Sequence, residues 1–441
     1  MTTGQTPKTI SPADAAGLVK SGDWVEYGGA LSQADLFDRA LAARKDELRG
    51  VKIRTVVTAA PRAVLECDPT GEHFLWFNWH FSAYDRAKNV DGRVSYIPMN
   101  FGELPDYYRR FIDPPDIACF KTTPMDAHGY FNFGPTVAHA KAVTERAKIV
   151  IVETCEAMPY VFGEQESVHV SEVTHVIDGG RGTLPELANP PIGEIDRTVA
   201  NIIAEQIENG SCLQIGIGGM PNAVCSVLKD AGLRDLGIHT EMFVDGMVDL
   251  IESGVVNGSR KQTHTYQSTY TFALGSRRMY DFLDRNPRVQ CLPVDLTNLP
   301  HYIAQNERVV SINNTTQIDL QGQCASESDG FRHLTGTGGQ LQFVRGAFAS
   351  KGGKSFMCLS STYERRGQRK SRIVATLTPG NIVTTPRTDV MYVVTEYGMA
   401  CLKGKSVAER VQALIALAHP EFREELEREA REKKLVPRGF W

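Results

Sequence analysis

Short runs of β-branched and apolar residues alternate with segments of helical periodicity along most of the chain. The clearest runs are residues 51–57, 117–120, 149–152, 289–294, 309–313, 373–377 and 390–395. Because consecutive parallel strands need a crossover connection, usually a helix, this alternation predicts α/β layers built around mostly parallel sheets. With 441 residues, the chain is long enough for two or three hydrophobic cores.

The periodic pattern breaks between Asp178 and Pro191, where the sequence reads DGGRGTLPELANPP. Glycine and proline without an apolar face are typical of a linker, so we predict two domains, residues 1–185 and 186–441. After the linker, apolar residues from Ile195 to Ile207 share one helical face, and Asn209-Gly210 is a plausible end for that helix.

A similar local pattern occurs once in each predicted domain. Residues 22–29 (GDWVEYGG) and 210–219 (GSCLQIGIGG) both follow a helix, form a short strand and run into paired glycines. The match suggests two halves of similar fold, although a chance likeness of two short segments is the alternative.

Composition excludes several classes of function. Lys and Arg total 48 against 52 Asp and Glu, a formal net charge of −4, so no overall basic field exists to hold nucleic acid or anionic lipid. No run approaches the length of a membrane span, and the first residues lack a signal-peptide pattern, so we expect a cytoplasmic protein. The nine cysteines are scattered without zinc-site spacing, so we expect reduced, mostly buried thiols and no metal.

The first motif that could carry chemistry is Gly216-Ile217-Gly218-Gly219-Met220-Pro221. Pro221 occupies the place of the third glycine of a dinucleotide fingerprint, which argues against NAD. Glycines after a strand still let the backbone approach a ligand, and a helix that begins at Pro221 could face a phosphate or carbonyl oxygen. The alternative is a tight turn with a structural role only.

A second glycine cluster spans Gly336–Gln340, and we expect it to precede a strand that contains Phe343 and Val344. Such a loop can present backbone N–H groups to a developing oxyanion. The segment from Lys351 to Ser355 resembles a phosphate loop only superficially, because Phe348 stands where that motif requires glycine.

The third signal is His239-Thr240-Glu241-Met242, which follows the apolar residues 236–238. Glu241 would then lie near the carboxyl end of a strand, where open α/β sheets bind their ligands. Spacing alone leaves open a merely solvated or ion-paired carboxylate, and it leaves Glu153, Glu327 and Glu396 as rivals. His239 is a weak candidate for a general base, because no Ser or Cys nucleophile motif accompanies it.

Taken together, these segments resemble the class I CoA-transferases, specifically the acetyl-CoA hydrolase/transferase group, which includes butyryl-CoA:acetate and 4-hydroxybutyrate CoA-transferases. The matching stretches are QIGIGGMPNAV (214–224), LGIHTEMFVDGMVDL (236–250), GTGGQLQFVRGA (336–347), VVTEYGMACLKGKSVAERVQALIALAHPEFREEL (393–426) and PMDAHGYFNFG (124–134). The likeness covers nearly the whole chain, and several motifs in the correct order are far more specific than any one of them.

The resemblance implies two tandem NagB/RpiA-like α/β domains with the active site between them, in a homodimer or homotetramer. It implies Glu241 as the covalent nucleophile and coenzyme A as a substrate, with no metal and no permanently bound cofactor. It also implies CoA contacts from Gly216, Ile217, Gly218, Gly219 and Met220 and from Gly338 and Gly339. One position departs from the family: Gln342 stands where Asp is usual, which keeps hydrogen bonding but removes a charge.

From this resemblance we expect transfer of CoA from a short-chain acyl-CoA, such as butyryl-CoA, to acetate or a similar carboxylate through a glutamyl-CoA thioester. Residues 76–80, 95–100 and 270–283 look most like the butyryl-CoA:acetate branch. The partners are then acyl-CoA and short-chain carboxylates, with neither nucleic acid nor membrane. The alternatives are a 4-hydroxybutyrate CoA-transferase, an acyl-CoA hydrolase in which water is the acceptor, and a regulator that only binds CoA or another metabolite.

Overall fold

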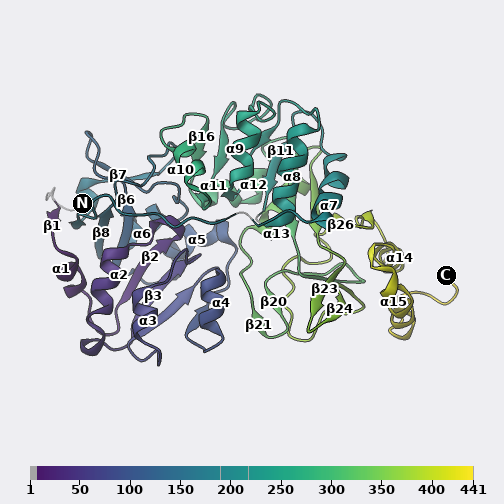
Figure 1. Cartoon of the computed structure of the whole chain (residues 1–441), viewed down its shortest axis with the longest axis horizontal. Coiled ribbons are helices and arrows are strands. Elements are labelled where there is room, and N and C mark those ends of the chain that lie inside the picture. Colours follow the sequence, from purple (N-terminus) through teal and green to yellow (C-terminus); the bar gives the residue numbers. More distant parts are fainter. Residues whose placement is uncertain (1–6, 189, 217, 441) are drawn as a thin grey trace. The chain divides into compact units, whose positions relative to one another are not determined.

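The computed structural model describes residues 7–188, 190–216 and 218–440, and its chain forms two compact units. Unit 1 contains the chain as far as Ala188, together with Glu241–Val244 and Thr269–Thr297. Unit 2 contains the segment that follows Ala188 as far as Thr240, then Asp245–Ser268, and then the chain from Asn298 to its end. The predicted domain boundary at residues 185 and 186 stays a prediction. Figure 1 follows the chain through both units.

Unit 1 is built on an eight-stranded sheet in which every neighbouring pair is parallel. Its order is β1 (Lys8–Thr9), β10 (His175–Ile177), β8 (Ile149–Thr154), β6 (Ile117–Thr122), β2 (Trp24–Gly29), β3 (Val51–Val56), β4 (Phe74–Asn78) and β5 (Val94–Tyr96). All six residues of β6 are buried, as expected for a central strand covered on both faces.

Helices and short ladders complete unit 1. The helices are α1 (Pro12–Gly17), α2 (Asp35–Ala42), α3 (Ala63–Cys67), α4 (Ala83–Asn89), α5 (Leu104–Asp106), α6 (Ala140–Arg146), α10 (Arg277–Leu283) and α11 (Val294–Asn298), the last of which reaches the unit boundary. The two-stranded ladders are β7 (Tyr130–Asn132) with β9 (Ser167–His169), β13 (Met242–Phe243) with β15 (Phe272–Ala273), and β14 (Ser268–Tyr270) with β16 (Val289–Cys291). The first residue of β14, Ser268, belongs to unit 2.

Unit 2 is built on a six-stranded sheet. Its order is β12 (Gly237–Ile238), β11 (Cys212–Ile215), β17 (Val309–Asn314), β22 (Lys354–Cys358), β26 (Tyr392–Thr395) and β27 (Gly398–Cys401). The first five strands are parallel, and β27 is antiparallel to β26.

The helices of unit 2 are α7 (Glu194–Ala204), α8 (Gly219–Asp230), α9 (Asp245–Glu252), α12 (Pro300–Ile303), α13 (Gln340–Ala349), α14 (Val407–Leu417) and α15 (Pro420–Glu432). Helices α7, α8 and α9 pack in succession, and α12 packs on α13 (Figure 1). Short ladders join β18 (Gln317–Asp319) to β19 (Cys324–Ala325) and β25 (Ile373–Val374), β20 (Ser328–Asp329) to β21 (Arg332–His333), and β23 (Thr362–Arg365) to β24 (Gln368–Ser371).

The two large sheets share one connection pattern. In unit 1, β3 lies on one side of β2, and β6, β8 and β10 follow in order on the other side. In unit 2, β12 lies on one side of β11, and β17, β22 and β26 follow in order on the other. Strands β2 and β11 are the two glycine-flanked strands of the sequence match, so the topology supports two halves of similar fold. Mixed α/β architecture around mostly parallel sheets is thereby confirmed.

Local predictions fared unevenly. The helix after the linker is confirmed as α7, but its predicted end at Asn209-Gly210 is wrong, because α7 ends at Ala204 and a turn follows. The C-terminal helical region is broken at His419-Pro420, between α14 and α15. The strand predicted around Phe343 and Val344 is wrong, because both residues lie in helix α13. Phe343, Val344 and Ala347 are buried on one face of that helix, and a short apolar run does not by itself distinguish a strand from a buried helical turn.

Two further features bear on the exclusions drawn from composition. All nine cysteines are free thiols, seven of them buried and two partly buried. Within the described part of the chain, no helix combines the length and the apolar character needed to cross a membrane.

Candidate active site

The carboxyl edge of the parallel sheet in unit 2 gathers the predicted motifs. The segments after β11, β12, β17 and β22 leave the sheet at this edge because these strands run parallel. Helix α8 begins directly after β11, and α13 precedes β22, so each starts at the same edge. Both glycine motifs therefore lie at helix N-termini, where the first N–H groups have no partner within the helix.

The first glycine turn has a backbone that other residues adopt only under strain. Gly218 has a φ of +123° and caps α8, and its carbonyl accepts a hydrogen bond of 3.1 Å from the N–H of Asn222. A Cβ on Gly219 would lie 2.8 Å from Oδ2 of Asp196, so a larger residue here would displace that side chain of α7. Met220 is buried in α8. Of the predicted CoA contacts in this turn, Ile217 lies outside the described residues.

The second glycine loop opens helix α13 rather than a strand. Gly338 has a φ of +54°, and Gly339 is the N-cap residue, whose carbonyl accepts a hydrogen bond of 2.9 Å from the N–H of Phe343. Gln342, at the position where the family usually has Asp, is buried in the first turn of this helix. The loop thus presents backbone N–H groups at the positive end of a helix dipole, the arrangement that stabilises an anion.

Neighbouring side chains anchor this loop. Glu327 is buried and accepts hydrogen bonds from Oγ1 of Thr337 at 3.1 Å and Oγ1 of Thr384 at 2.9 Å. Nε2 of Gln340 donates to Oγ of Ser326 at 2.9 Å. The loop therefore has side-chain anchors on both sides of its glycine pair.

The end of β12 reaches the first turn of α13. The N–H of His239 donates to the carbonyl of Leu213 at 3.0 Å, and Oγ1 of Thr240 donates to the carbonyl of Ile215 at 3.5 Å. The buried imidazole of His239 lies 6.3 Å from the ring of Phe343, centroid to centroid. The glycine turn, the glycine loop and His239-Thr240 are therefore brought together at one edge of one sheet.

Glu241 follows Thr240 directly, at the point where the chain passes from unit 2 to unit 1. Its carbonyl accepts hydrogen bonds from the N–H groups of Thr271 at 3.0 Å and Phe272 at 3.3 Å. Glu241 is partly exposed, whereas its neighbours Thr240 and Met242 are buried. The backbone of the predicted nucleophile is thus fixed on both sides while its residue retains access to solvent.

The three rival carboxylates have structural roles. Glu153 accepts hydrogen bonds of 2.9 Å from the N–H groups of residues 35, 36 and 37, and so caps α2. Glu327 anchors the glycine loop, as described above. Glu396 accepts hydrogen bonds from the N–H of Ser361 at 2.9 Å and from its hydroxyl at 2.5 Å.

Sequence reasoning missed two features at this edge. Gln214 of β11 and Ser311 and Asn313 of β17 form a buried network, with Ser311 Oγ donating to Gln214 Oε1 at 2.7 Å and Asn313 Nδ2 donating to the same oxygen at 3.0 Å. Polar residues inside otherwise apolar strands were the available signal. The second feature is Lys261, which is buried against the end of β12. A lysine in a polar loop carries no such signal, because lysine side chains are usually exposed.

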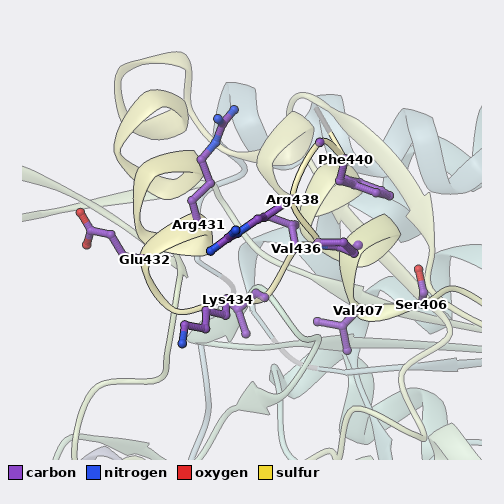
Figure 2. A pocket seen from close by; sticks show the side chains of 12 residues that line it. Ser406, Val407, Arg431, Glu432, Lys434, Val436, Arg438 and Phe440 are labelled. Atoms are coloured by element: carbon purple, nitrogen blue, oxygen red, sulfur yellow. The ribbon is translucent and has the colours of Figure 1, made fainter.

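A separate hollow of about 1020 Å³ lies beneath the C-terminal tail (Figure 2). Val407, Leu435, Val436 and Phe440 line it together with the cations Arg431, Lys434 and Arg438. Its carboxylate, Glu432, points away from Phe440 in Figure 2. None of the predicted site residues lines this hollow, so it offers no support for the predicted chemistry.

Among residues 7–188, 190–216 and 218–440, no group of three or more His, Cys, Asp and Glu side chains could hold a metal ion.

Comparison with known proteins identifies the family. Residues 3–183 match the acetyl-CoA hydrolase/transferase N-terminal domain, and residues 275–430 match the C-terminal domain. The chain is 44% identical to butyryl-CoA:acetate CoA-transferase of Anaerostipes caccae over 98% of each chain. It is also 44% identical to succinyl-CoA:cyclohexane-1-carboxylate CoA transferase of Geobacter metallireducens, over 96% of this chain and 95% of that protein.

A solved structure agrees with these relatives. The crystal structure of RipA from Yersinia pestis superposes with a TM-score of 0.89 at 36% identity, and the match covers 97% of this chain and 98% of that one. The predicted resemblance and the predicted class of enzyme, a CoA-transferase, are confirmed. The chain belongs to the acetyl-CoA hydrolase/transferase family.

Proposed function

We propose that this protein transfers CoA from a short-chain acyl-CoA, with butyryl-CoA as the model donor, to acetate or a similar carboxylate. The observation that carries the proposal is the position of Glu241. It directly follows Thr240, at the sheet edge where both glycine motifs open helices. We take its carboxylate as the nucleophile of an acyl transfer, a reaction in which helix N-termini can stabilise the negative charge that develops on oxygen.

The reaction divides into two exchanges at Glu241. Its carboxylate attacks the thioester carbonyl, the C–S bond breaks, and an acyl-glutamyl anhydride and CoA thiolate form. The thiolate then attacks the glutamyl carbonyl, which releases the first acid and leaves a glutamyl-CoA thioester. An incoming carboxylate reverses both steps and departs as the new acyl-CoA. Both leaving groups are anions, so little proton transfer is required.

The residues of the chain supply positioning and charge stabilisation. We assign the N–H groups at Gly338 and Gly339 to the tetrahedral oxyanion, and the turn from Gly216 to Met220 to contacts with CoA. Removal of one oxyanion donor typically costs about 10²- to 10³-fold in rate. Coenzyme A enters as a substrate, and its long tail can supply binding energy for orienting the reacting carbonyl.

The choice of acids is the finer part of the proposal. Two relatives with equal identity to this chain are named for different acids, acetate with butyryl-CoA in one and succinyl-CoA with cyclohexane-1-carboxylate in the other. Overall identity therefore does not select the acyl group, and our preference for butyryl-CoA rests on the local likeness of residues 76–80, 95–100 and 270–283. We also propose a homodimer or homotetramer, which light scattering would measure.

The deciding experiment is a mass determination with peptide mapping. The protein is incubated with butyryl-CoA in the absence of an acceptor and then supplied with acetate. We expect a CoA-sized adduct on the peptide that contains Glu241, and its discharge by acetate as acetyl-CoA. Glu396→Gln is the matched control, since Glu396 lies after β26 at the same sheet edge, and it should form the adduct normally.

Other outcomes have distinct meanings. Steady release of CoA and butyrate without acetate would make water the acceptor and the protein a hydrolase. An adduct on a different carboxylate would refute Glu241 as the nucleophile. Absence of any reaction with a panel of short-chain acyl-CoAs would refute the transferase proposal.

A further inference from the structure

Lys261 is a buried cation held by two backbone carbonyls. Its Nζ donates to the carbonyl of Ile238 at 2.9 Å and to the carbonyl of Gln267 at 2.7 Å, and the residue is only 4% exposed. Burial of a lysine ammonium is costly, and its retention in a core calls for a specific role for its donors.

The two carbonyls belong to the two segments that lead to the Glu241 backbone. Ile238 is the last residue of β12 and stands three residues before Glu241. Gln267 directly precedes β14, and four residues later the N–H of Thr271 donates to the carbonyl of Glu241. One side chain therefore ties together the strand that delivers the nucleophile and the strand that leads to its backbone donors.

The surrounding packing fixes the lysine stem. A Cβ on Gly237 would lie 2.6 Å from Cγ of Lys261, so the stem passes directly over this glycine. The loop that carries Lys261 is held by Asn306, whose Oδ1 accepts hydrogen bonds from the N–H groups of Gln262 at 3.1 Å and Thr263 at 3.3 Å.

The same loop contains unfavourable backbone conformations. His264 and Tyr266 have φ values of +48° and +67°, a region in which residues other than glycine are uncommon. Such strain persists only where the surrounding structure enforces it. Here the strained loop places an ammonium group at the end of β12.

We propose that Lys261 is a positioning residue for Glu241. Its two carbonyl contacts fix the segment that precedes the nucleophile and the segment that leads to Thr271, whose N–H donates to the carbonyl of Glu241. The inference rests on the proposed function, in which Glu241 attacks the thioester. A nucleophile displaced by about 1 Å can lose about 10²-fold in rate, so the two contacts can matter even if Lys261 never touches the substrate.

The test is Lys261→Met, which retains an unbranched stem and removes the donors. We expect kcat for butyryl-CoA:acetate exchange to fall about 10- to 100-fold, while KM for butyryl-CoA stays within about twofold. Formation of the Glu241 adduct in a single turnover should slow by the same factor as kcat. Lys354→Met is the matched control, because Nζ of Lys354 also donates to a carbonyl, that of Gln206 at 2.8 Å, but lies partly exposed. It should leave both rates unchanged.

A second variant perturbs the same contact while keeping the amine. Gly237→Ala adds one methyl group against the Lys261 stem, and we expect a smaller decrease in adduct rate with KM again unchanged. It decides the question if Lys261→Met does not fold.

The two proposals fail in different ways. If the wild-type protein forms no adduct at Glu241, the proposed function fails whatever the variants do. If the wild type forms the adduct and a folded Lys261→Met protein forms it at the same rate, the positioning role is refuted. A lower melting temperature with a wild-type adduct rate would make Lys261 a structural residue only.

Discussion

The buried ammonium of Lys261 should lower the stability of the protein by an amount that depends on pH. Burial lowers the pKa of this group to about 8, from an ordinary value of 10.5. At neutral pH this pKa difference lowers the unfolding free energy by about 3 kcal/mol. Between pH 8 and 10.5 the unfolded chain binds more protons at this residue than the folded chain does. Stability from this group therefore rises with pH through that window and is lowest below pH 8.

Replacement of Lys261 by Met separates this cost from the loss of hydrogen bonds. In the variant, the two carbonyls lack a donor at every pH. In the wild type they keep one at every pH, because a neutral amine donates to them as an ammonium does. The proton-linked cost disappears in the variant. We therefore expect the unfolding free energy of the wild type to rise relative to Lys261→Met by about 2 kcal/mol between pH 7 and pH 9.5.

Urea unfolding at the two pH values measures this difference. Burial raises the pKa of the nearby Cys212 thiol to about 11, so this thiol stays neutral in the folded protein over the range. Cys212 is buried in unit 2, and its modification in a short pulse of thiol reagent reports the unfolded fraction of that unit. A difference between the proteins that changes by less than about 0.5 kcal/mol would refute the assignment of a costly buried charge.

Three further predictions concern other residues. Glu241→Ala should abolish CoA exchange while leaving the affinity for CoA, measured by calorimetry, within about threefold; full activity would refute the mechanism. Gln342→Asp should change kcat/KM a few-fold for some acceptor acids, and an unchanged profile across several acids would remove this position from consideration. Burial also lowers the pKa of His139 from 6.5 to about 3, so its unfolded form binds more protons across that window and stability falls with decreasing pH. Relative to His139→Phe, the unfolding free energy of the wild type should fall by about 2 kcal/mol between pH 8 and pH 5. Urea unfolding followed by the fluorescence of Trp24, Trp76 and Trp79 in unit 1 measures this, and equal pH profiles of the two proteins would contradict it.

The parallel sheets were predictable because their strands are covered on both faces. Strands β6 and β8 are largely buried, and each begins with a continuous apolar run, residues 117–120 and 149–152. Phe343 and Val344 form a similar short apolar run but belong to a helix. The run alone does not show this, because the helical face becomes visible only when Ala347 is included. The membership of residues 241–244 in unit 1 had no local signal, because it depends on the pairing of β13 with the distant β15.

The glycine motifs were predictable from the sequence, whereas the choice among carboxylates needed more information. The positive φ values of Gly218 and Gly338 favour a residue without a Cβ, so the backbone conformation of these turns is reflected directly in the residue type. Glu241 was distinguished from Glu153, Glu327 and Glu396 only by the family resemblance. The structure adds the hydrogen-bond partners of the three rivals, which give each of them a structural role, while Glu241 stays a prediction.

The segment that leads to Glu241 is held by contacts outside its own strand pairing. Strand β12 has only two residues and lies at the edge of its sheet, so few ladder hydrogen bonds hold the segment that leads to the proposed nucleophile. The remaining restraint comes from three hydrogen bonds outside the ladder. The hydroxyl of Thr240 donates to the carbonyl of Ile215 in β11, and Nζ of Lys261 donates to the carbonyl of Ile238. The N–H of Thr271 donates to the carbonyl of Glu241 itself. A short edge strand lets the chain turn away immediately and leaves Glu241 partly exposed, which a longer paired strand would not. Because each restraint is a separate contact, their loss should be graded, and only removal of the Glu241 carboxylate should abolish the reaction.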